Sequence, residues 1–278
     1  MPHSDPTARQ LPTQKYYHYQ SFCKDGLIPI LRDKKLRFSD PHDVNDPWDC
    51  KPWFDCRPML EDPVKREEMI AFLRTLDPSE NLANQCLTGY ENKLRTDNDA
   101  LLKRVEAYSR GLTKEIGKRR IYCLTPFPTS TLMWSHYSNN HRGICLEFDK
   151  NNPLIEKARP VRYKKTYPEW TPQDLMVDPL ALLFTKAMDW CYEREFRIIA
   201  TSLEGPTKLD GNFVTLPVGA LTAIILGCES EDEAELTGIV NEYAPGLAIK
   251  RADRSPNHYE LTIAEAISTA GPAAEAPS

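Results

Sequence analysis

The sequence lacks any run of about 18 consecutive apolar residues, which is the length that a membrane-spanning helix needs. Its first residues, MPHSDPTARQLPTQ, lack the charged and then apolar pattern of a secretory signal peptide. No internal repeat is visible either. These absences predict a cytoplasmic protein without a membrane partner.

The chain also lacks an excess of positive charge. The chain has 35 Lys and Arg residues against 40 Asp and Glu residues, and its formal net charge is -5. An extended nucleic-acid surface needs a basic field, so we expect none here. A small anionic ligand such as a nucleotide needs positive charge only locally, so the composition does not exclude such a ligand.

The eight cysteines include no CxxC pair, and the chain is too long to depend on disulfides for a core. We expect the thiols to be reduced and mostly buried, with Cys145 and Cys191 acting as small hydrophobic residues inside strands. A catalytic cysteine is the weaker alternative, because none is expected at a helix N-terminus beside a histidine.

The hydrophobic pattern predicts an α+β fold with one domain over residues 15–266. Residues 1–14 and 267–278 are polar or rich in Ala and Pro, and we expect disordered tails there. Helical spacing dominates residues 57–118, which are predicted to form a helical insertion. Few regular crossover helices separate the remaining strands, which favours α+β over a doubly wound parallel sheet.

Local signals place the individual elements. Helices are expected at 26–33, after Asp62 with Pro63 at its first position, after Asp178-Pro179, and after a capping box at Ser230-x-x-Glu233. Strand patterns occur at residues 16–22, 35–39, 121–125, 144–148, 161–164, 190–201, 213–216, 223–226, 247–251 and 258–262.

The segment WCYEREFRII at 190–199 places ionisable residues in what reads as a buried strand. Strand alternation puts its aromatic residues on one face and Glu193, Glu195 and Arg197 on the other. Such a face can present an acid–base site or a site that stabilises a cation. A plain solvent-facing edge is the alternative, and the segment alone does not decide between them.

The first strand carries Tyr17-His18-Tyr19, and alternation separates His18 from the two tyrosines. A histidine there can hold a phosphate or a ribose hydroxyl. The alternative is a structural histidine satisfied by the backbone.

A polar loop, SDPHDVNDPWD, follows the strand at 35–39. Loops held by a rigid scaffold often carry sites, so Ser39, Asn45 and Asp46 are candidate site residues, although an Asx-rich turn explains the loop equally simply. The glycine and terminal glutamate of a calcium loop are missing.

The segment MWSHYSNNHRG at 133–143 is predicted to be a short helix that leads into a strand. Trp134, Tyr137 and His141 recur at helical spacing and can line a cleft or pack in the core. His136 and His141 do not have the HExxH form, so no metal site is expected from them.

These segments together resemble a widespread bacterial family known only as a domain of unknown function, number 2971. The resemblance covers about residues 16–228 and rests on YHY at 17–19, VNDPWD at 44–49, MWSHYSNNHRG at 133–143 and WCYEREFR at 190–197. The sequence departs from the family at Val44, where the family's loop usually has phenylalanine.

The order of a first-strand histidine, a tyrosine-bearing element and a Glu-x-Glu strand is also similar to the ADP-ribosyltransferase fold. That resemblance implies a split, mostly antiparallel β-sheet core and NAD as the substrate. It implies that His18 holds the NAD ribose or pyrophosphate and that Tyr137 or Trp134 stacks on nicotinamide. Glu195 would then be catalytic and Glu193 would orient the acceptor.

The remaining candidate ligand-binding residues of that resemblance are Ser39, Asn45, Asp46, His136 and Arg197. Arg197 either pairs with Glu195 in the empty site or binds a ligand phosphate.

The implied function is an NAD-dependent ADP-ribosyltransferase or NAD-consuming effector, of a toxin or phage-defence kind, with an unknown acceptor. One alternative is a metal-dependent nuclease or phosphoesterase with ligands from Asp46, His136, His141, Glu193 and Glu195. Another is a nucleotide-binding module without turnover.

Overall fold

The computed structural model describes residues 14–51, 56–75, 84–168, 178 and 180–267. The predicted tails therefore lie almost wholly outside the described residues, as does Pro179. The contacts divide the mixed α+β chain into two compact units. The first unit comprises residues 1–39, 120–161 and 189–278, and the second comprises residues 40–119 and 162–188.

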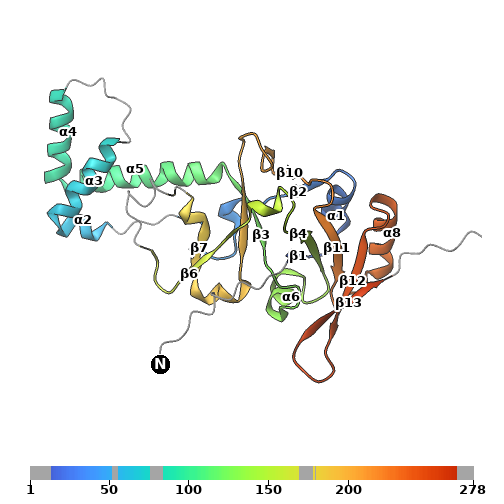
Figure 1. Ribbon diagram of the computed structural model, residues 1–278. Coiled ribbons are helices and arrows are strands. Elements are labelled where there is room, and N and C mark those ends of the chain that lie inside the picture. The colour runs from blue at the N-terminus through green and yellow to red at the C-terminus, as the bar shows by residue number, and fades with distance from the viewer. Residues whose placement is uncertain (1–13, 52–55, 76–83, 169–177, 179, 268–278) are drawn as a thin grey trace, which may run out of the picture. The chain divides into compact units, whose positions relative to one another are not determined.

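The largest sheet of the first unit has five strands (Figure 1). Their order is β1 (Lys15–Gln20), β4 (Ile144–Asp149), β11 (Leu221–Leu226), β12 (Ala248–Arg254) and β13 (Leu261–Ile267). Neighbouring strands are antiparallel except β11 and β12, which are parallel and are connected through helix α8 (Glu233–Tyr243). A parallel pair requires such a crossover.

Two smaller antiparallel sheets complete the strands of this unit. One contains β3 (Arg120–Leu124), β8 (Phe196–Ala200) and β5 (Arg159–Pro160), and the other contains β2 (Lys35–Arg37), β10 (Phe213–Thr215) and β9 (Leu209–Asp210). Single bridges, Tyr17 to Thr125 and Ser39 to Ile121, connect these ladders. The β-structure is therefore divided into short, mostly antiparallel ladders.

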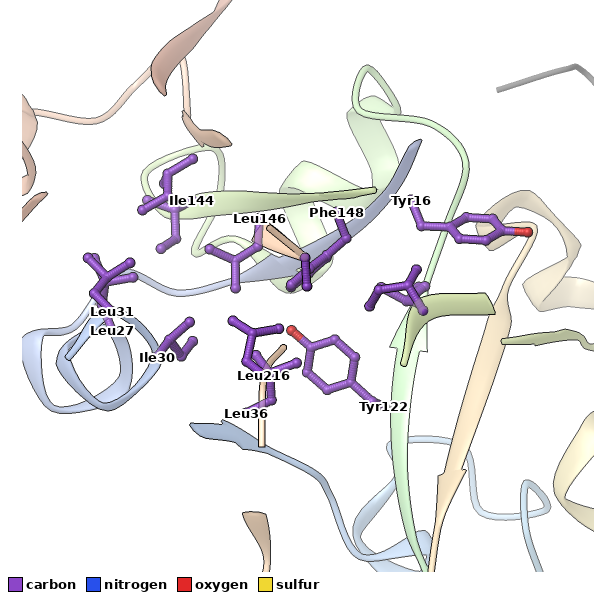
Figure 2. Packing of buried hydrophobic residues seen from close by; sticks show 14 of the residues in the cluster. Tyr16, Leu27, Ile30, Leu31, Leu36, Tyr122, Ile144, Leu146, Phe148 and Leu216 are labelled. Atoms are coloured by element: carbon purple, nitrogen blue, oxygen red, sulfur yellow. The ribbon is translucent and has the colours of Figure 1, made fainter. Parts of the chain in front are cut away.

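The main core of the first unit lies on one face of the five-stranded sheet (Figure 2). Strand alternation on β4 directs Ile144, Leu146 and Phe148 into this core, together with residues of helix α1 (Lys24–Leu31). Burying one such side chain contributes about 2 kcal/mol. The apolar alternation of β4 is thus what attaches the sheet to its helices.

The opposite face of the sheet is covered by helix α6 (Thr131–Tyr137). Trp134 is fully buried there against Tyr19, Cys145 and Ile225. The side chain of Ser130 accepts a hydrogen bond from the Met133 amide, which starts the helix. Because α6 is anchored in this way, Tyr137 and the residues after it have a defined position on the sheet.

The second unit contains a cluster of helices with its own core. The helices are α2 (Arg57–Glu61), α3 (Pro63–Thr75), α4 (Asn84–Thr96) and α5 (Asn98–Gly117). As predicted, Asp62 caps α3, where its carboxylate accepts the Val64 amide at 2.8 Å. The unit also has a parallel strand pair, β6 (Arg162–Lys164) and β7 (Thr185–Ala187).

Short 3-10 turns make up the remaining elements: η2 (Pro41–Asp43), η3 (Ile155–Lys157), η4 (Ala181–Phe184) and η5 (Met188–Glu193). Among the described residues, no helix combines the length and apolar character that crossing a bilayer demands.

Three local predictions need correction. The expected strand at 190–201 begins only at Phe196, because residues 188–193 form η5. Helix α6 ends at Tyr137, so His141 does not continue its stripe. Helix α8 begins at Glu233 after Asp232, and the Ser230 hydroxyl accepts the Asp232 amide instead of capping the helix.

Candidate functional site

The candidate site is built around the junction of η5 and β8. Arg194 lies between them with a φ of 44°, the left-handed region that bulky residues rarely adopt. Its amide donates to the Cys191 carbonyl at 3.2 Å and its guanidinium lies 4.8 Å from the centre of the Phe127 ring. The tight turn means that the two glutamates flanking Arg194 contact different partners.

Glu195 and Arg197 form a bidentate ion pair. Arg197 donates from Nε to Glu195 Oε1 at 2.6 Å and from an Nη atom to Oε2 at 2.9 Å. Glu195 immediately precedes β8 and Arg197 is the second residue of that strand, and they are 5% and 0% exposed. A buried carboxylate needs such a charged partner, because removal from water otherwise penalises its charge heavily.

Glu193 contacts a different element. The Tyr137 hydroxyl, at the end of α6, donates to Glu193 Oε1 at 2.5 Å. Glu193 is 2% exposed. This hydrogen bond connects two sequence motifs that are 56 residues apart.

His18 of β1 contacts β3, the strand that pairs with β8. Its Nδ1 lies 2.8 Å from the Cys123 carbonyl oxygen, which can only accept, so Nδ1 carries the proton. The ring stacks on Tyr122 at 4.2 Å. Burial lowers the pKa of His18, and the bond to Cys123 opposes that shift only partly.

His18 and the ion pair meet through β3. Cys123, whose carbonyl accepts from His18, is the residue opposite Arg197 in the β3–β8 ladder. Contacts therefore run from His18 through one backbone residue to β8, the strand that carries Arg197, the partner of Glu195. The neutral imidazole leaves Nε2 as a hydrogen-bond acceptor.

A row of aromatic side chains lies near the glutamates. The ring of exposed His136 is 6.3 Å from that of Tyr137 and 6.1 Å from that of Tyr192, and Tyr192 is 6.1 Å from Trp190. Tyr192 and Trp190 are half-buried. Strand alternation assigned both to the core, and η5 is the reason that they are not there.

Trp134 does not belong to this row of aromatic side chains, because it lies in the core. It is fully buried, donates from Nε1 to the Pro128 carbonyl at 2.8 Å, and packs edge-on against Tyr19. Its ring faces are therefore used by the core.

The loop candidates divide between the units. Ser39 is exposed and pairs by its backbone with Ile121 of β3. Asn45 is exposed and Asp46 is buried, and both belong to the second unit. Asp46 Oδ1 accepts the Trp48 amide at 2.9 Å, whereas Oδ2 has no hydrogen-bond partner among the described residues.

A lysine-lined cavity in the second unit was not foreseen from the sequence. It has a volume of about 220 Å³ and is lined by Lys164, Lys165 and Lys186 beside Trp48, which is 64% exposed. Lys186 is itself buried, 3.7 Å from Asp49. The adjacent lysines at the end of β6, Lys164 and Lys165, were the signal that the sequence offered, and the lysine-lined cavity suits an anion.

Comparison with known proteins adds one finding. The sequence model of a family described as a protein of unknown function, DUF2971, matches residues 133–198. That segment contains α6, Tyr137 and both glutamates, so the match supports the relation to this family over the part of the chain that builds the site. No curated protein and no solved structure matches the chain.

Proposed function

We propose that the first unit binds NAD and breaks the bond between nicotinamide and ribose, as an ADP-ribosyltransferase or NAD-consuming effector. The observation that carries this proposal is the pair of nearly buried carboxylates at the η5–β8 junction. Glu195 is held by Arg197 and Glu193 by Tyr137. Acidic groups that are held in place by such partners are suited to stabilise a developing positive charge.

The chemistry explains why fixed carboxylates are useful. When the bond from ribose C1′ to nicotinamide breaks, nicotinamide keeps the electron pair and positive charge develops on the ribose. A carboxylate beneath that ribose stabilises the transition state more than the ground state. Water or an acceptor nucleophile then forms the new bond to C1′ and releases a proton.

We assign Glu195 to the ribose cation and Glu193 to the acceptor. Arg197 holds both oxygens of Glu195, so this carboxylate needs little reorganisation during the reaction. Glu193 accepts the hydrogen bond of Tyr137 at the end of α6, and we give it the role of orienting the acceptor because Glu195 is held by Arg197 instead.

His18 is assigned to the ribose hydroxyls rather than to the pyrophosphate. Its lowered pKa favours the neutral imidazole, and Nε2 then accepts a hydrogen bond from a hydroxyl. Tyr137 and the exposed ring of His136, with Tyr192, supply the surface for stacking a planar ring.

The metal-dependent alternative gains no support from the described residues. Among them, no three His, Cys, Asp or Glu side chains gather closely enough to hold a metal ion. Binding of a nucleotide without turnover remains the alternative that an experiment must separate from catalysis.

The test is release of nicotinamide from NAD by the full chain, measured chromatographically. We expect Glu195→Gln to lower the rate by about 100-fold or more, because the amide cannot offset a positive charge. Gln preserves the shape of the side chain and one acceptor for Arg197. The control is Glu156→Gln, which alters an exposed carboxylate of the same unit that pairs with Lys157.

Full activity in Glu195→Gln would reject the assignment. Intact NAD after long incubation, together with saturable binding, would instead support a binding module. For an effector of a toxin or phage-defence kind, expression in bacteria should lower cellular NAD, and Glu195→Gln should prevent this.

A further inference from the structure

A second cluster of reactive side chains lies in the first unit and has no role in the proposed NAD chemistry. Cys228 Sγ is 3.8 Å from His141 Nδ1, and His141 Nε2 is 3.0 Å from the hydroxyl oxygen of Ser135. The three residues come from the loop after β11, the turn after α6 and α6 itself. A thiol, an imidazole and a hydroxyl thus form one chain of hydrogen bonds.

The contacts define the arrangement of protons in this cluster. When the thiol donates to Nδ1, the proton of the neutral imidazole is on Nε2 and is donated to Ser135. Ser135 therefore holds the imidazole in the tautomer that can take a proton from Cys228. This is the relation of nucleophile, base and orienting group that nucleophilic catalysis requires.

Backbone contacts fix the base in place. Asn139, Asn140 and His141 have successive φ angles of 47°, 53° and 66°. The His141 amide donates to the Trp134 carbonyl at 3.2 Å, and the His141 carbonyl accepts the Glu229 amide at 3.1 Å. The loop carrying Cys228 is therefore bonded directly to the turn carrying His141.

The cluster opens into a cavity of about 780 Å³. Cys228 and His141 line it together with Thr131 and residues 254–261 of the β12–β13 hairpin. Cys228 and His141 are both half-buried, so a ligand in this cavity can reach the thiol. The volume is large enough for a small organic molecule.

We propose that Cys228, His141 and Ser135 form a thiol nucleophile site for an acyl donor, that is, an activated ester or thioester bound in this cavity. His141 Nδ1 removes the thiol proton as Sγ forms a bond to the acyl carbon. The bond from that carbon to the leaving oxygen or sulfur breaks, and the leaving group takes the proton from Nδ1. The products are an S-acyl cysteine and an alcohol or thiol.

Electrostatics indicate a neutral pair at rest. Burial lowers the pKa of His141, opposed by Glu229, and burial raises the pKa of Cys228, with Glu229 acting in the same direction and Arg254 and Arg251 in the opposite one. The other ionisable groups lining the cavity are His258, Tyr259 and Glu260, and Arg254 is 3.3 Å from Glu229. The thiol then depends on His141 for deprotonation during attack.

The pH dependence in the unmodified protein is the first test, with p-nitrophenyl acetate as the acyl donor and peptide mass spectrometry to locate the acetyl group. The acetylation rate of Cys228 should rise as His141 loses its proton and level off by about pH 6.5. A thiol without a base reacts only as the thiolate, and because burial raises the pKa of Cys228 its rate would keep rising beyond about pH 8.5. A Cys228 acetylation rate that follows the thiolate profile, without levelling off near pH 6.5, would overturn the proposal.

Variants provide the second test. Cys228→Ser should abolish acetylation at this site, and His141→Asn should slow it by about 100-fold or more at pH 7. Asn is chosen because it tolerates the left-handed backbone. Ser135→Ala keeps the imidazole, and we expect it to lower the acetylation rate of Cys228 by less than His141→Asn does. Cys23→Ala, which removes an exposed thiol elsewhere, should change nothing at Cys228.

An unchanged Cys228 rate in folded His141→Asn and Ser135→Ala would reject the base assignment. Nicotinamide release by His141→Asn separates this site from the NAD site, because the two proposals use different residues and fail independently.

Discussion

At the scale of single residues, burial sets the charge state of the two histidines that the structure ties to backbone or hydroxyl groups. The pKa values of His18 and His141 are both lowered, mainly by desolvation. A neutral imidazole can accept a hydrogen bond from one nitrogen, and both proposed sites use this property.

This has a consequence for stability. Because the folded pKa of His18 lies below its unfolded value of about 6.5, the unfolded state binds more protons as the pH falls. The stability that the neutral His18 contributes to the folded state is fully present above about pH 6.5, and it is lost as the pH falls toward the lower folded pKa. The free energy of unfolding in urea should therefore decrease from pH 7 to pH 5, with His141 contributing in the same direction.

His18→Gln should flatten this decrease, since its amide can donate to Cys123 without titrating. His258→Gln, at an exposed position, is the control. A slope in His18→Gln as steep as in the unmodified protein would contradict the assignment of a desolvated imidazole.

Glu195 and Arg197 also show what a sequence leaves undecided about single residues. Both roles of Arg197, as partner of Glu195 or as ligand for a phosphate, were compatible with the spacing. The structure shows the bidentate contact between Arg197 and Glu195, and binding of a ligand phosphate by Arg197 stays a prediction. Spacing along a strand places side chains on one face, but rotamers and burial decide which groups pair.

At the scale of elements, the turn between α6 and β4 depends on a close approach of backbones. A Cβ atom on Gly227 would lie 2.0 Å from the His141 carbonyl oxygen, and one on Gly143 would lie 2.4 Å from that of Gln20. No side chain fits at either contact. Glycine is therefore required where the ends of β11 and β4 meet this turn.

Gly227→Ala should destabilise the protein by about 3 kcal/mol, since the backbone must shift to relieve the contact. Gly238→Ala is a matched control, because Gly238 lies in α8 with nothing near its Cβ position, and alanine there should stabilise by about 0.5–1 kcal/mol. Urea unfolding measures both changes. Equal stability of the two variants would show that the contact does not constrain the fold.

Most elements were predictable because their periodicity is local. The pattern located β1, β3, β4, β11 and β12 and the start of α3 within a few residues, and it marked residues 57–118 as helical without separating α2 and α4. The segment that became η5 was predicted incorrectly, because WCYE has the alternation of a strand. A single left-handed residue, Arg194, ends the 3-10 turn, and no composition signal marks it.

At the scale of the whole molecule, the chain has separate hydrophobic cores in its two units. Leu101 of α5 lies in the core of the second unit and Leu146 of β4 lies in that of the first, and both are fully buried. The helical segment predicted as an insertion into one domain supplies most of the second unit.

Leu101→Ala should destabilise the helical core by about 3 kcal/mol, through lost burial and the cavity left behind. Amide hydrogen exchange should accelerate first in α3 and α5. Leu146→Ala is the matched truncation in the other core and should first accelerate exchange in β1, β4 and β11. Identical exchange patterns in the two variants would mean that the cores do not behave as separate units.

The sequence by itself determined the mixed α+β class, most strands and helices, and the segments that carry the candidate residues, because apolar periodicity and capping residues act over a few positions. Only the tertiary structure decided that Tyr137 meets Glu193, that His18 reaches the strand of Arg197 through Cys123, and that Cys228 meets His141. Those contacts join residues 56 to 105 positions apart. They depend on how β1, α6 and β11 are brought together around shared cores, which no local pattern encodes.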